Sequence, residues 1–399
     1  MRLAAKLLAE VEVSADSSHQ HELNAGLLRQ ALELPEETLR GTIDLTYLAR
    51  GQEDPFGETS SYTLYNAREG KPRTPEYRLY LDSRQFQDVT RPGDILLISR
   101  PGDGVSLRAL VVPADSALGT SIARVLSDKG TALEQRFRRI SSLVDATDLT
   151  ALLQASSDPA LPHDQGLMAH ANESFVQHAL QVGRIPNTRD MADEAVQMVR
   201  RYRTTVLDPD AELHLSLLAE TVLFQHIEKE LGQRALDRLG STGHMGFEDV
   251  AKLIMGLLQS RKSRRGQSLQ HHFRRLLDYR GIQYTAQCRT ERNETPDFVI
   301  PGFRAYHDSA FPAERLRMVA CKSTLKERWG QVLKEADRIH QKYVLTLDST
   351  LTDDLIRNMS EKQLHLFLPG PIITESYSGR PVAMLLAKVA DLLDYLAAA

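Results

Sequence analysis

Cysteine is scarce in this sequence, since only Cys288 and Cys321 occur among its 399 residues. Two cysteines cannot form a disulfide framework, and this pair lacks the CxxC spacing that zinc and redox motifs need. We therefore expect two buried or half-buried thiols in a reducing compartment.

Long hydrophobic runs are also missing. No window approaches eighteen consecutive apolar residues, and residues 1–10 are too short and too charged for the core of a signal peptide. We expect a soluble cytoplasmic protein without membrane contacts. The segment 240–246 lacks the GK[ST] ending of a phosphate loop, so the use of ATP is not expected.

Neither sign of charge is in large excess. The chain has 49 Lys and Arg against 53 Asp and Glu, a formal net charge of −4. This balance excludes a uniformly basic surface, which proteins that neutralise DNA phosphates often have. The basic residues are nevertheless concentrated locally, because residues 261–275 include six of them and no acidic residue.

The length and composition favour two globular domains. A hydrophobic content of 42% and a charged content of 26% are ordinary for folded proteins, and 399 residues exceed one ordinary core. The stretch 154–166 is polar and contains two prolines, which predicts a linker. We expect a β-rich domain over 1–153 and an α/β domain over 167–399.

The local patterns differ between these two parts. Short β-rich runs separated by turn residues predict strands at 42–48, 61–65, 77–81, 94–98 and 105–112. The turn 101–104 predicts that the last two form a hairpin. In the second part, strand-like runs alternate with helical periodicity, which indicates a central sheet flanked by helices. The predicted helices are 211–224, 247–258, 266–280, 326–342 and 381–397. The predicted strands are 283–288, 297–300 and 316–321, and apolar runs follow at 343–347 and 364–368.

Charged residues stand at the ends of two of these strands. Asp297 begins one strand and Lys322 ends another. A carboxylate there can hold a divalent cation that polarises a phosphate, while the ammonium orients or deprotonates an attacking water, as phosphodiester hydrolysis requires. Glu335, thirteen residues after Lys322 on the predicted helix 326–342, is the candidate for a second metal-binding carboxylate. The alternative is a solvated lysine and a surface aspartate.

Longer blocks of sequence around these residues carry a family resemblance. The blocks are 261–266, 295–298, 305–308, 311–312, 316–318 and 322–341. Over about 200–350 the chain resembles the catalytic domain of EcoRII-type restriction endonucleases. This resemblance implies the PD-(D/E)XK fold with a central mixed sheet, Mg2+-dependent cleavage of double-stranded DNA, and a homodimer with one active site per subunit.

The resemblance also implies roles for single residues. Asp297 matches the metal-binding aspartate, Lys322 the catalytic lysine, and Tyr306 a tyrosine of the active site. Glu335 matches the carboxylate that this branch moves from the strand to the helix, which accounts for Ala320 two residues before Lys322. On the helix 268–277, Gln270 and Arg274 replace acidic residues of the relative, which argues against a second metal site there.

Two basic segments are candidates for DNA contacts. Lys326, Glu327 and Arg328 resemble the recognition cluster of the family, and their side chains could read GG·CC in the major groove. The residues Arg261, Lys262, Arg264 and Arg265 would contact phosphates without reading sequence. In both cases the alternative is a solvated helix face.

The N-terminal part is similar, more loosely, to the effector domain of the same family, a DNA-binding pseudobarrel. Basic and aromatic residues are interleaved over 61–78, and His19, Lys71 and Arg73 are the best matched residues. The similarity implies a domain that binds a second copy of the recognition sequence, and that could cover the catalytic cleft until it does so. The alternative is a β domain with a few surface arginines.

The sequence therefore predicts a homodimeric type II restriction endonuclease of a restriction-modification system. It would use Mg2+ to cut double-stranded DNA at a short palindrome with a CC…GG core and leave 5′-phosphate ends. A cognate DNA methyltransferase would act on the same site without forming a stable complex. Two alternatives stay open: a DNA-binding regulator with an inactive nuclease core, and a repair or mobile-element nuclease that shares only the core.

Overall fold

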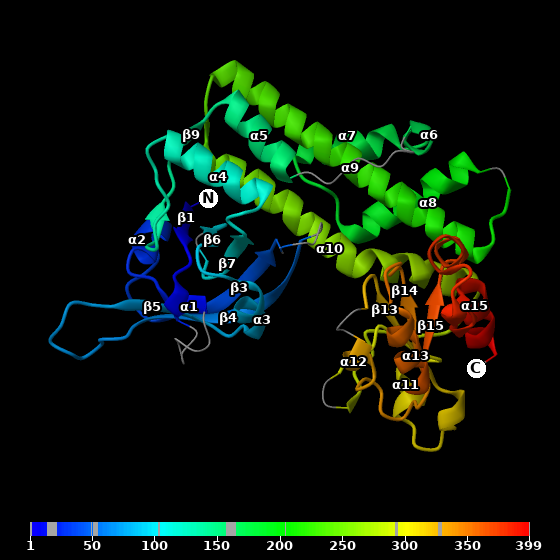
Figure 1. Cartoon of the computed structure of the whole chain (residues 1–399). Helices are drawn as coiled ribbons and strands as arrows, with labels where there is room; N and C mark the ends of the chain where they lie inside the picture. Colours follow the sequence, from blue (N-terminus) through cyan, green and yellow to red (C-terminus); the bar gives the residue numbers. More distant parts are fainter. Residues whose placement is uncertain are drawn as a thin grey trace. The chain divides into compact units, whose positions relative to one another are not determined.

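The computed structural model describes residues 2–13, 22–48, 50, 55–102, 104–156, 165–203, 205–291, 294–325 and 329–398, with only the backbone described at Gln165, Gly240 and Arg265. The chain forms two compact units (Figure 1). Unit 1 comprises Met1–Ala160, Val182–Ile185 and Ile227–Lys262, and unit 2 comprises Leu161–Gln181, Pro186–His226 and Ser263–Ala399. Two long helices, α9 (Pro209–Thr242) and α10 (Phe247–Tyr279), contribute to both units.

These compact units are assembled differently from the two domains expected from sequence. Residues 227–262 belong to unit 1, although the expected boundary at 154–166 would place them in the second domain. Most of the expected linker, 157–164, lies outside the described residues, and residues 154–156 end helix α5 (Ala146–Ser156). The division into 1–153 and 167–399 stays a prediction.

Unit 1 is built on a mostly antiparallel sheet. Among the described residues this sheet has eight strands in the order β2-β5-β4-β3-β7-β6-β1-β8, in which only the β3–β7 pair is parallel. The strands are β1 (Arg2–Leu7), β2 (Glu22–Asn24), β3 (Leu39–Tyr47), β4 (Phe56–Asn66), β5 (Tyr77–Leu81), β6 (Ile95–Arg100), β7 (Leu107–Val112) and β8 (Arg138–Arg139). The strands β6 and β7 pair antiparallel, as the predicted hairpin requires.

Alternating side chains divide the core of unit 1 between the two faces of this sheet. Ile43, Leu45 and Tyr47 of β3 point into one cluster, together with α2 (Leu28–Leu32) and α3 (Arg84–Val89). Leu97 and Leu110 point to the other face. There they pack against α4 (Ala117–Asp128), α5 and the apolar side of 235–258. Unit 1 is therefore a sheet with helices on both faces, and the expected β-rich pseudobarrel domain stays a proposal.

Short elements complete unit 1. Helix α1 (Glu10–Val13) follows β1, and β9 (Leu143–Val144) pairs with β10 (Met245–Gly246) just before α10. No helix among the described residues combines the length and the hydropathy that a membrane span needs.

Unit 2 contains the mixed sheet that the sequence predicts. Six described strands lie in the order β11-β12-β13-β14-β15-β16. The first three are antiparallel, and β13 to β16 are parallel. Their bounds are β11 (Thr285–Ala286), β12 (Phe298–Ile300), β13 (Arg317–Lys322), β14 (Lys342–Thr346), β15 (Leu364–Leu368) and β16 (Leu386–Lys388).

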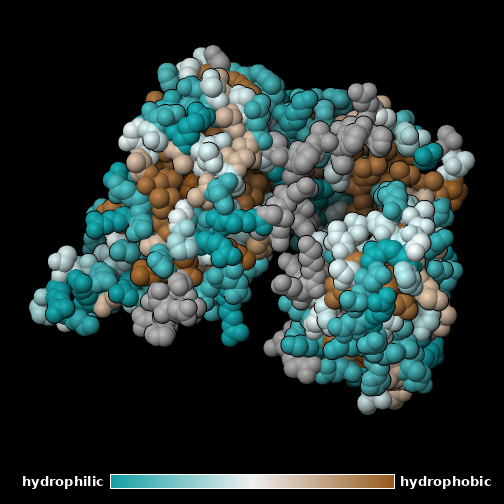
Figure 2. All heavy atoms as spheres, viewed as in Figure 1, coloured by the Kyte–Doolittle hydropathy of each residue, from teal (hydrophilic) through white to brown (hydrophobic). Residues whose placement is uncertain are grey.

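Helices cover both faces of this mixed sheet. On one face, Val299, Met318 and Ala320 pack with α11 (Phe303–His307), α12 (Trp329–Val332) and α13 (Asp353–Glu361). On the other face, Phe298 and Val319 pack with 269–277 of α10 and with α15 (Val389–Ala397). The surface around α11 and α13 is mainly hydrophilic in the view of Figure 2, in keeping with apolar side chains gathered in these two layers. The remaining helices are α6 (Gln165–Met168), α7 (Glu173–Val182), α8 (Thr188–Tyr202) and α14 (Gly370–Ile372), with single turns at Ala313–Arg315, Ile373–Tyr377 and Pro381–Leu385.

Two of the predicted helices are wrong in part. Among the described residues of 326–342, α12 ends at Val332 and a turn follows it. Ala336 then takes a left-handed conformation with φ of 51° before the chain enters β14. In 381–397, residues Leu386–Lys388 form β16, since they pair in parallel with β15. Helix α15 begins only at Val389.

A buried carboxylate connects distant parts of unit 2. Asp210, in the first turn of α9, is 4% exposed and accepts hydrogen bonds from the backbone amides of Gly370, Val389 and Ala390 at 2.8, 2.9 and 3.0 Å. The carboxylate thereby caps the first turn of α15. It also fixes the segment that follows β15.

We expect Asp210→Asn to lower the free energy of unfolding by about 1.5–3 kcal/mol, because at least one charge-assisted hydrogen bond to a buried amide is lost. Urea denaturation measures the change. The control is Asp354→Asn, whose side chain is 96% exposed and should alter stability little. Equal stability of the two variants would contradict the capping role of Asp210.

Candidate active site

The two strand-end residues singled out from sequence lie together in unit 2. Phe298 of β12 pairs with Val319 of β13, so Asp297, directly before β12, lies next to the last residues of β13. The Lys322 ammonium donates to Asp297 Oδ2 at 3.1 Å. Asp297 is 5% exposed, whereas the Lys322 side chain is 22% exposed and so reaches solvent.

The Asp297 carboxylate is surrounded by hydrogen-bond donors. The backbone amide of Cys321 donates to Oδ2 at 2.7 Å, beside the Lys322 ammonium. The side-chain amides of Gln270 and Gln287 donate to Oδ1 at 2.8 and 3.0 Å. Together these donors match the acceptor capacity of a carboxylate. Gln270, which the sequence marks as a replacement of an acidic residue, is thus a direct neighbour of Asp297.

Gln287 was not foreseen from sequence, although it holds Asp297 twice. Besides the side-chain contact, its backbone amide donates to the Asp297 carbonyl at 3.0 Å. Its φ of 49° is left-handed, an unusual conformation for a residue other than glycine. Left-handed residues other than glycine are concentrated at functional sites, so the backbone of Gln287 is a structural signal for this site that the sequence does not give.

Glu335 completes the candidate site, but from a turn and not from the predicted helix. It is 8% exposed, and burial raises the pKa of its carboxyl group to about 7 against the opposing effect of the Lys322 charge, while Asp297 adds to the rise. Burial alone would lower the pKa of Lys322, but Asp297 and Glu335 outweigh burial and raise it. The three side chains therefore form one electrostatic group.

One atom of this group lacks a hydrogen-bond partner among the described residues. Glu335 Oε2 is buried and accepts no hydrogen bond there. A buried carboxylate oxygen without a donor is costly, and a cation beside it would satisfy it. Behind it, the buried Lys342 donates to the carbonyl oxygens of Glu335 and Ala336, and burial lowers the pKa of Lys342 to about 8.

Tyr306, which the family resemblance places in the active site, has other partners here. It is buried in the core of unit 2, and its hydroxyl donates to Glu291 Oε2 at 2.6 Å. Burial raises the pKa of this hydroxyl well above its usual value. No hydrogen bond among the described residues joins Tyr306 to Asp297 or Lys322. Its catalytic role stays a prediction.

The basic residues of α10 are engaged inside the compact units. Arg261 is 3% exposed and pairs with Glu228 at 2.5 Å, and the Lys262 ammonium contacts Asp44 at 2.7 Å. Arg264 lies over the ring of Phe224 and donates to Thr221 at 2.8 Å. The structure thus uses these side chains for packing. Their predicted role in phosphate contacts is not tested by these observations.

Several predicted DNA contacts lie outside the described residues. These are His19, Lys326, Glu327 and Arg328, and the side chain of Arg265 is likewise not described. Lys71 and Arg73 are described, and both are exposed in the connection between β4 and β5.

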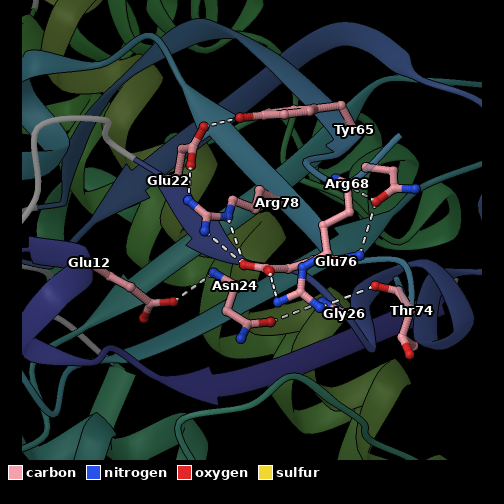
Figure 3. Close-up of polar contacts among 10 residues, drawn as sticks. Glu12, Glu22, Asn24, Gly26, Tyr65, Arg68, Thr74, Glu76 and Arg78 are labelled. Atoms are coloured by element: carbon pink, nitrogen blue, oxygen red, sulfur yellow. Dashed lines mark hydrogen bonds and ion pairs between the residues drawn. The ribbon is translucent and has the colours of Figure 1, made fainter. Parts of the chain in front are cut away.

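A polar network fixes the base of this connection (Figure 3). Arg78 of β5 contacts Glu22 at 2.6 Å and Glu76 at 2.7 Å, and Arg68 contacts Glu76 at 2.6 Å. The hydroxyl of Tyr65 donates to Glu22, which joins β4 to the edge strand β2. The exposed Lys71 and Arg73 therefore extend from an ordered base.

A family model matches the part of the chain that contains the mixed sheet and the strand-end cluster of unit 2. Residues 224–391 match the model of the EcoRII C-terminal domain, and this range includes Asp297, Lys322 and Glu335. Over this region the chain is therefore similar to the EcoRII C-terminal domain, as the sequence blocks predict.

Two curated proteins that are similar to this chain are type II restriction enzymes. The chain is 37% identical over 172 residues to the type II restriction enzyme EcoRII of Escherichia coli, which covers 43% of this chain and 42% of that enzyme. It is 27% identical over 122 residues to the type II restriction enzyme SsoII of Shigella sonnei, covering 28% of this chain and 39% of that enzyme. The matches thus span about two fifths of the length of each relative.

Solved structures of restriction endonucleases are also similar. A complex of the restriction endonuclease PspGI with substrate DNA is 19% identical, with a TM-score of 0.42, covering 54% of this chain and 93% of that chain. Metal-depleted Ecl18kI in complex with uncleaved, modified DNA is 18% identical, with a TM-score of 0.44, covering 56% of this chain and 82% of that chain.

The raised pKa of Glu335 makes stability depend on pH. In EDTA the folded protein keeps this proton up to about pH 7, while the unfolded chain releases it near 4.5. The ionised group therefore lowers the free energy of unfolding as the pH rises from about 5 to about 7. Because Glu335→Gln removes this effect, we expect its Tm relative to wild type to be higher at pH 8 than at pH 5.

Differential scanning calorimetry at the two pH values measures this difference. Glu361→Gln, at an exposed position of α13, is the control and should show no such pH dependence. The same relative Tm of Glu335→Gln at both pH values would show that Glu335 titrates as an ordinary surface carboxylate.

Proposed function

We propose that the protein is a type II restriction endonuclease that hydrolyses double-stranded DNA. The observation that carries this proposal is the group formed by Asp297 and Lys322 at two strand ends and Glu335 in a nearby turn, within the region that matches the EcoRII C-terminal domain. Two carboxylates with a lysine between them are the residue types that metal-dependent phosphodiester hydrolysis uses.

The donor set fits Mg2+. Among the described residues, no group of three or more His, Cys, Asp and Glu side chains is arranged to hold a metal ion. Mg2+ commonly takes only one or two protein carboxylates and completes its shell with water and substrate phosphates. Glu335 and Asp297 would hold it, with the ion displacing one of the four donors to Asp297, and the partnerless Glu335 Oε2 supports this assignment. When bound, the ion would polarise the phosphate and lower the pKa of a bound water.

The protein's own groups then have defined tasks. Lys322, partly exposed beside Asp297, holds the water that attacks phosphorus in line with the leaving oxygen. The P–O3′ bond breaks, which leaves a 5′-phosphate and a 3′-hydroxyl. Gln270 and Gln287 keep the Asp297 carboxylate in place through their amide donors.

The segment after Lys322 would recognise the DNA sequence. Lys326, Glu327 and Arg328 would read a CC…GG core, because Arg and Lys donate to guanine and Glu accepts from cytosine. A homodimer would present two such segments to a palindrome. A cognate DNA methyltransferase would protect the same site without a stable complex.

The N-terminal domain would bind a further copy of the recognition sequence through His19, Lys71 and Arg73. The exposure of Lys71 and Arg73 above the ordered Arg78 network supports this role. Binding there would relieve inhibition of cleavage, which is coupling between two distinct DNA sites.

A sequence-specific DNA-binding regulator with an inactive nuclease core is the second candidate. The contact of neutral Gln270 with Asp297 favours it, because the relative carries an acidic residue at that position. A repair or mobile-element nuclease would share the core but would nick DNA or cut it by structure.

Lys322→Ala should lower the rate of plasmid cleavage by at least about a hundredfold, because the positioned proton-transfer or charge-stabilising group is lost. The assay incubates full-length protein and methylation-free plasmid with Mg2+ or with EDTA, and gel electrophoresis follows the fragments. Lys252→Ala, an exposed lysine of α10, is the control. Cleavage by Lys322→Ala at the wild-type rate would refute the assignment, and retarded but intact DNA with wild-type protein would favour the regulator.

Lys71→Ala with Arg73→Ala should abolish the stimulation of cleavage by a second copy of the recognition sequence, while binding of the catalytic domain to DNA persists. The test uses the full chain, because residues 227–262 belong to unit 1 and removal of 1–164 would expose their apolar side. Cleavage of one-site and two-site plasmids gives the readout, with the exposed Arg91→Ala as control. Unchanged stimulation in the double variant would count against an effector role.

A further inference from the structure

Lys342 is a buried cation without a carboxylate in hydrogen-bond contact among the described residues. It is the first residue of β14 and is 5% exposed. Its ammonium donates to two backbone carbonyl oxygens, those of Glu335 and Ala336, the second at 2.6 Å. Burying an ammonium group costs free energy. Lys342 should therefore have a role that a neutral side chain could not fill.

The two carbonyl oxygens belong to the turn that presents Glu335. The amide of Glu335 donates to Val332 at 3.2 Å, where α12 ends, and the amide of Ile339 donates to Ala336 at 2.9 Å. Ala336 lies in the left-handed region at φ of 51°. A lysine that binds carbonyl oxygens after a helix acts as a cap, and here the cap comes from a separate strand.

Lys342 is itself fixed in the sheet. Its backbone amide donates to the Gln363 carbonyl at 3.0 Å, and it pairs with Leu364 at the start of β15. The turn that carries Glu335 is therefore tied to the parallel half of the sheet, in which β13 places Lys322. Elements of regular structure hold functional groups more accurately than free loops.

We propose that Lys342 is a positioning residue for Glu335. By holding the carbonyl oxygens of the 335–336 turn, it keeps the Glu335 carboxylate directed at Lys322 and Asp297. This inference rests on the proposed function, because the positioned carboxylate is the one expected to bind the metal ion. A role in packing alone would affect stability but not metal binding.

Binding of Mn2+ to full-length protein, followed by electron paramagnetic resonance of the free ion, tests the proposal. Lys342→Met keeps most of the side-chain length and removes the donors, and we expect it to weaken Mn2+ binding about 10–100-fold, as loss of a group that orients a metal ligand does. Lys342→Arg keeps the charge and the donors and should recover part of the affinity. Lys252→Met is the matched control at an exposed lysine.

A double-mutant cycle with Glu335→Ala separates positioning from packing. If Lys342 acts through Glu335, Lys342→Met has no further effect on Mn2+ binding once Glu335 is absent. An equal loss of affinity in both backgrounds would overturn the proposal, as would wild-type Mn2+ binding by Lys342→Met. Should Lys342→Met fail to fold, Lys342→Gln retains a donor and is measured in the same cycle.

Failure of this inference is distinguishable from failure of the proposed function. Wild-type protein that neither binds Mn2+ nor cuts DNA with it would refute the metal-dependent function. Wild-type protein that binds Mn2+ and cuts, beside a Lys342→Met variant that does both equally well, would refute the positioning role alone.

Discussion

The burial of the Asp297 carboxylate is the constraint around which the candidate site is organised. A carboxylate that is 5% exposed needs donors, and its donors come from three parts of unit 2. Gln270 comes from the long helix α10, Gln287 from the end of β11, and Lys322 from the end of β13. The helix layer and the antiparallel half of the sheet are thus joined at one side chain. Removing one partner of such a buried group typically costs about 3–5 kcal/mol.

The change of strand direction in the sheet explains why charges meet at this place. β13 is antiparallel to β12 and parallel to β14, so its end faces both Asp297 and the chain that returns to β14. The turn carrying Glu335 lies on that return path. Burial and mutual charge then set the properties of the group: the pKa of Glu335 is raised to about 7, and that of Lys342 is lowered to about 8.

Sequence patterns predicted the strands and the pair of Asp297 and Lys322, because alternation and strand ends are local properties. They predicted Glu335 as the third member but placed it on a helix, since the left-handed Ala336 and the distant Lys342 leave no local signal. Gln287 and Glu291 were missed for the same reason: their partners are set by tertiary contacts. The run 261–275 shows a limit of local inference, because charge composition cannot reveal that Arg261 is buried against Glu228.

We propose that this group of side chains cuts DNA at a fixed sequence. Sequencing the ends of unmethylated genomic DNA after digestion tests it most directly, with wild-type protein and an Asp297→Asn variant compared in Mg2+. The account predicts 5′-phosphate ends at one short palindrome with a CC…GG core for the wild type, and no such ends for the variant. Ends scattered without a common sequence, or the same ends from Asp297→Asn, would contradict it.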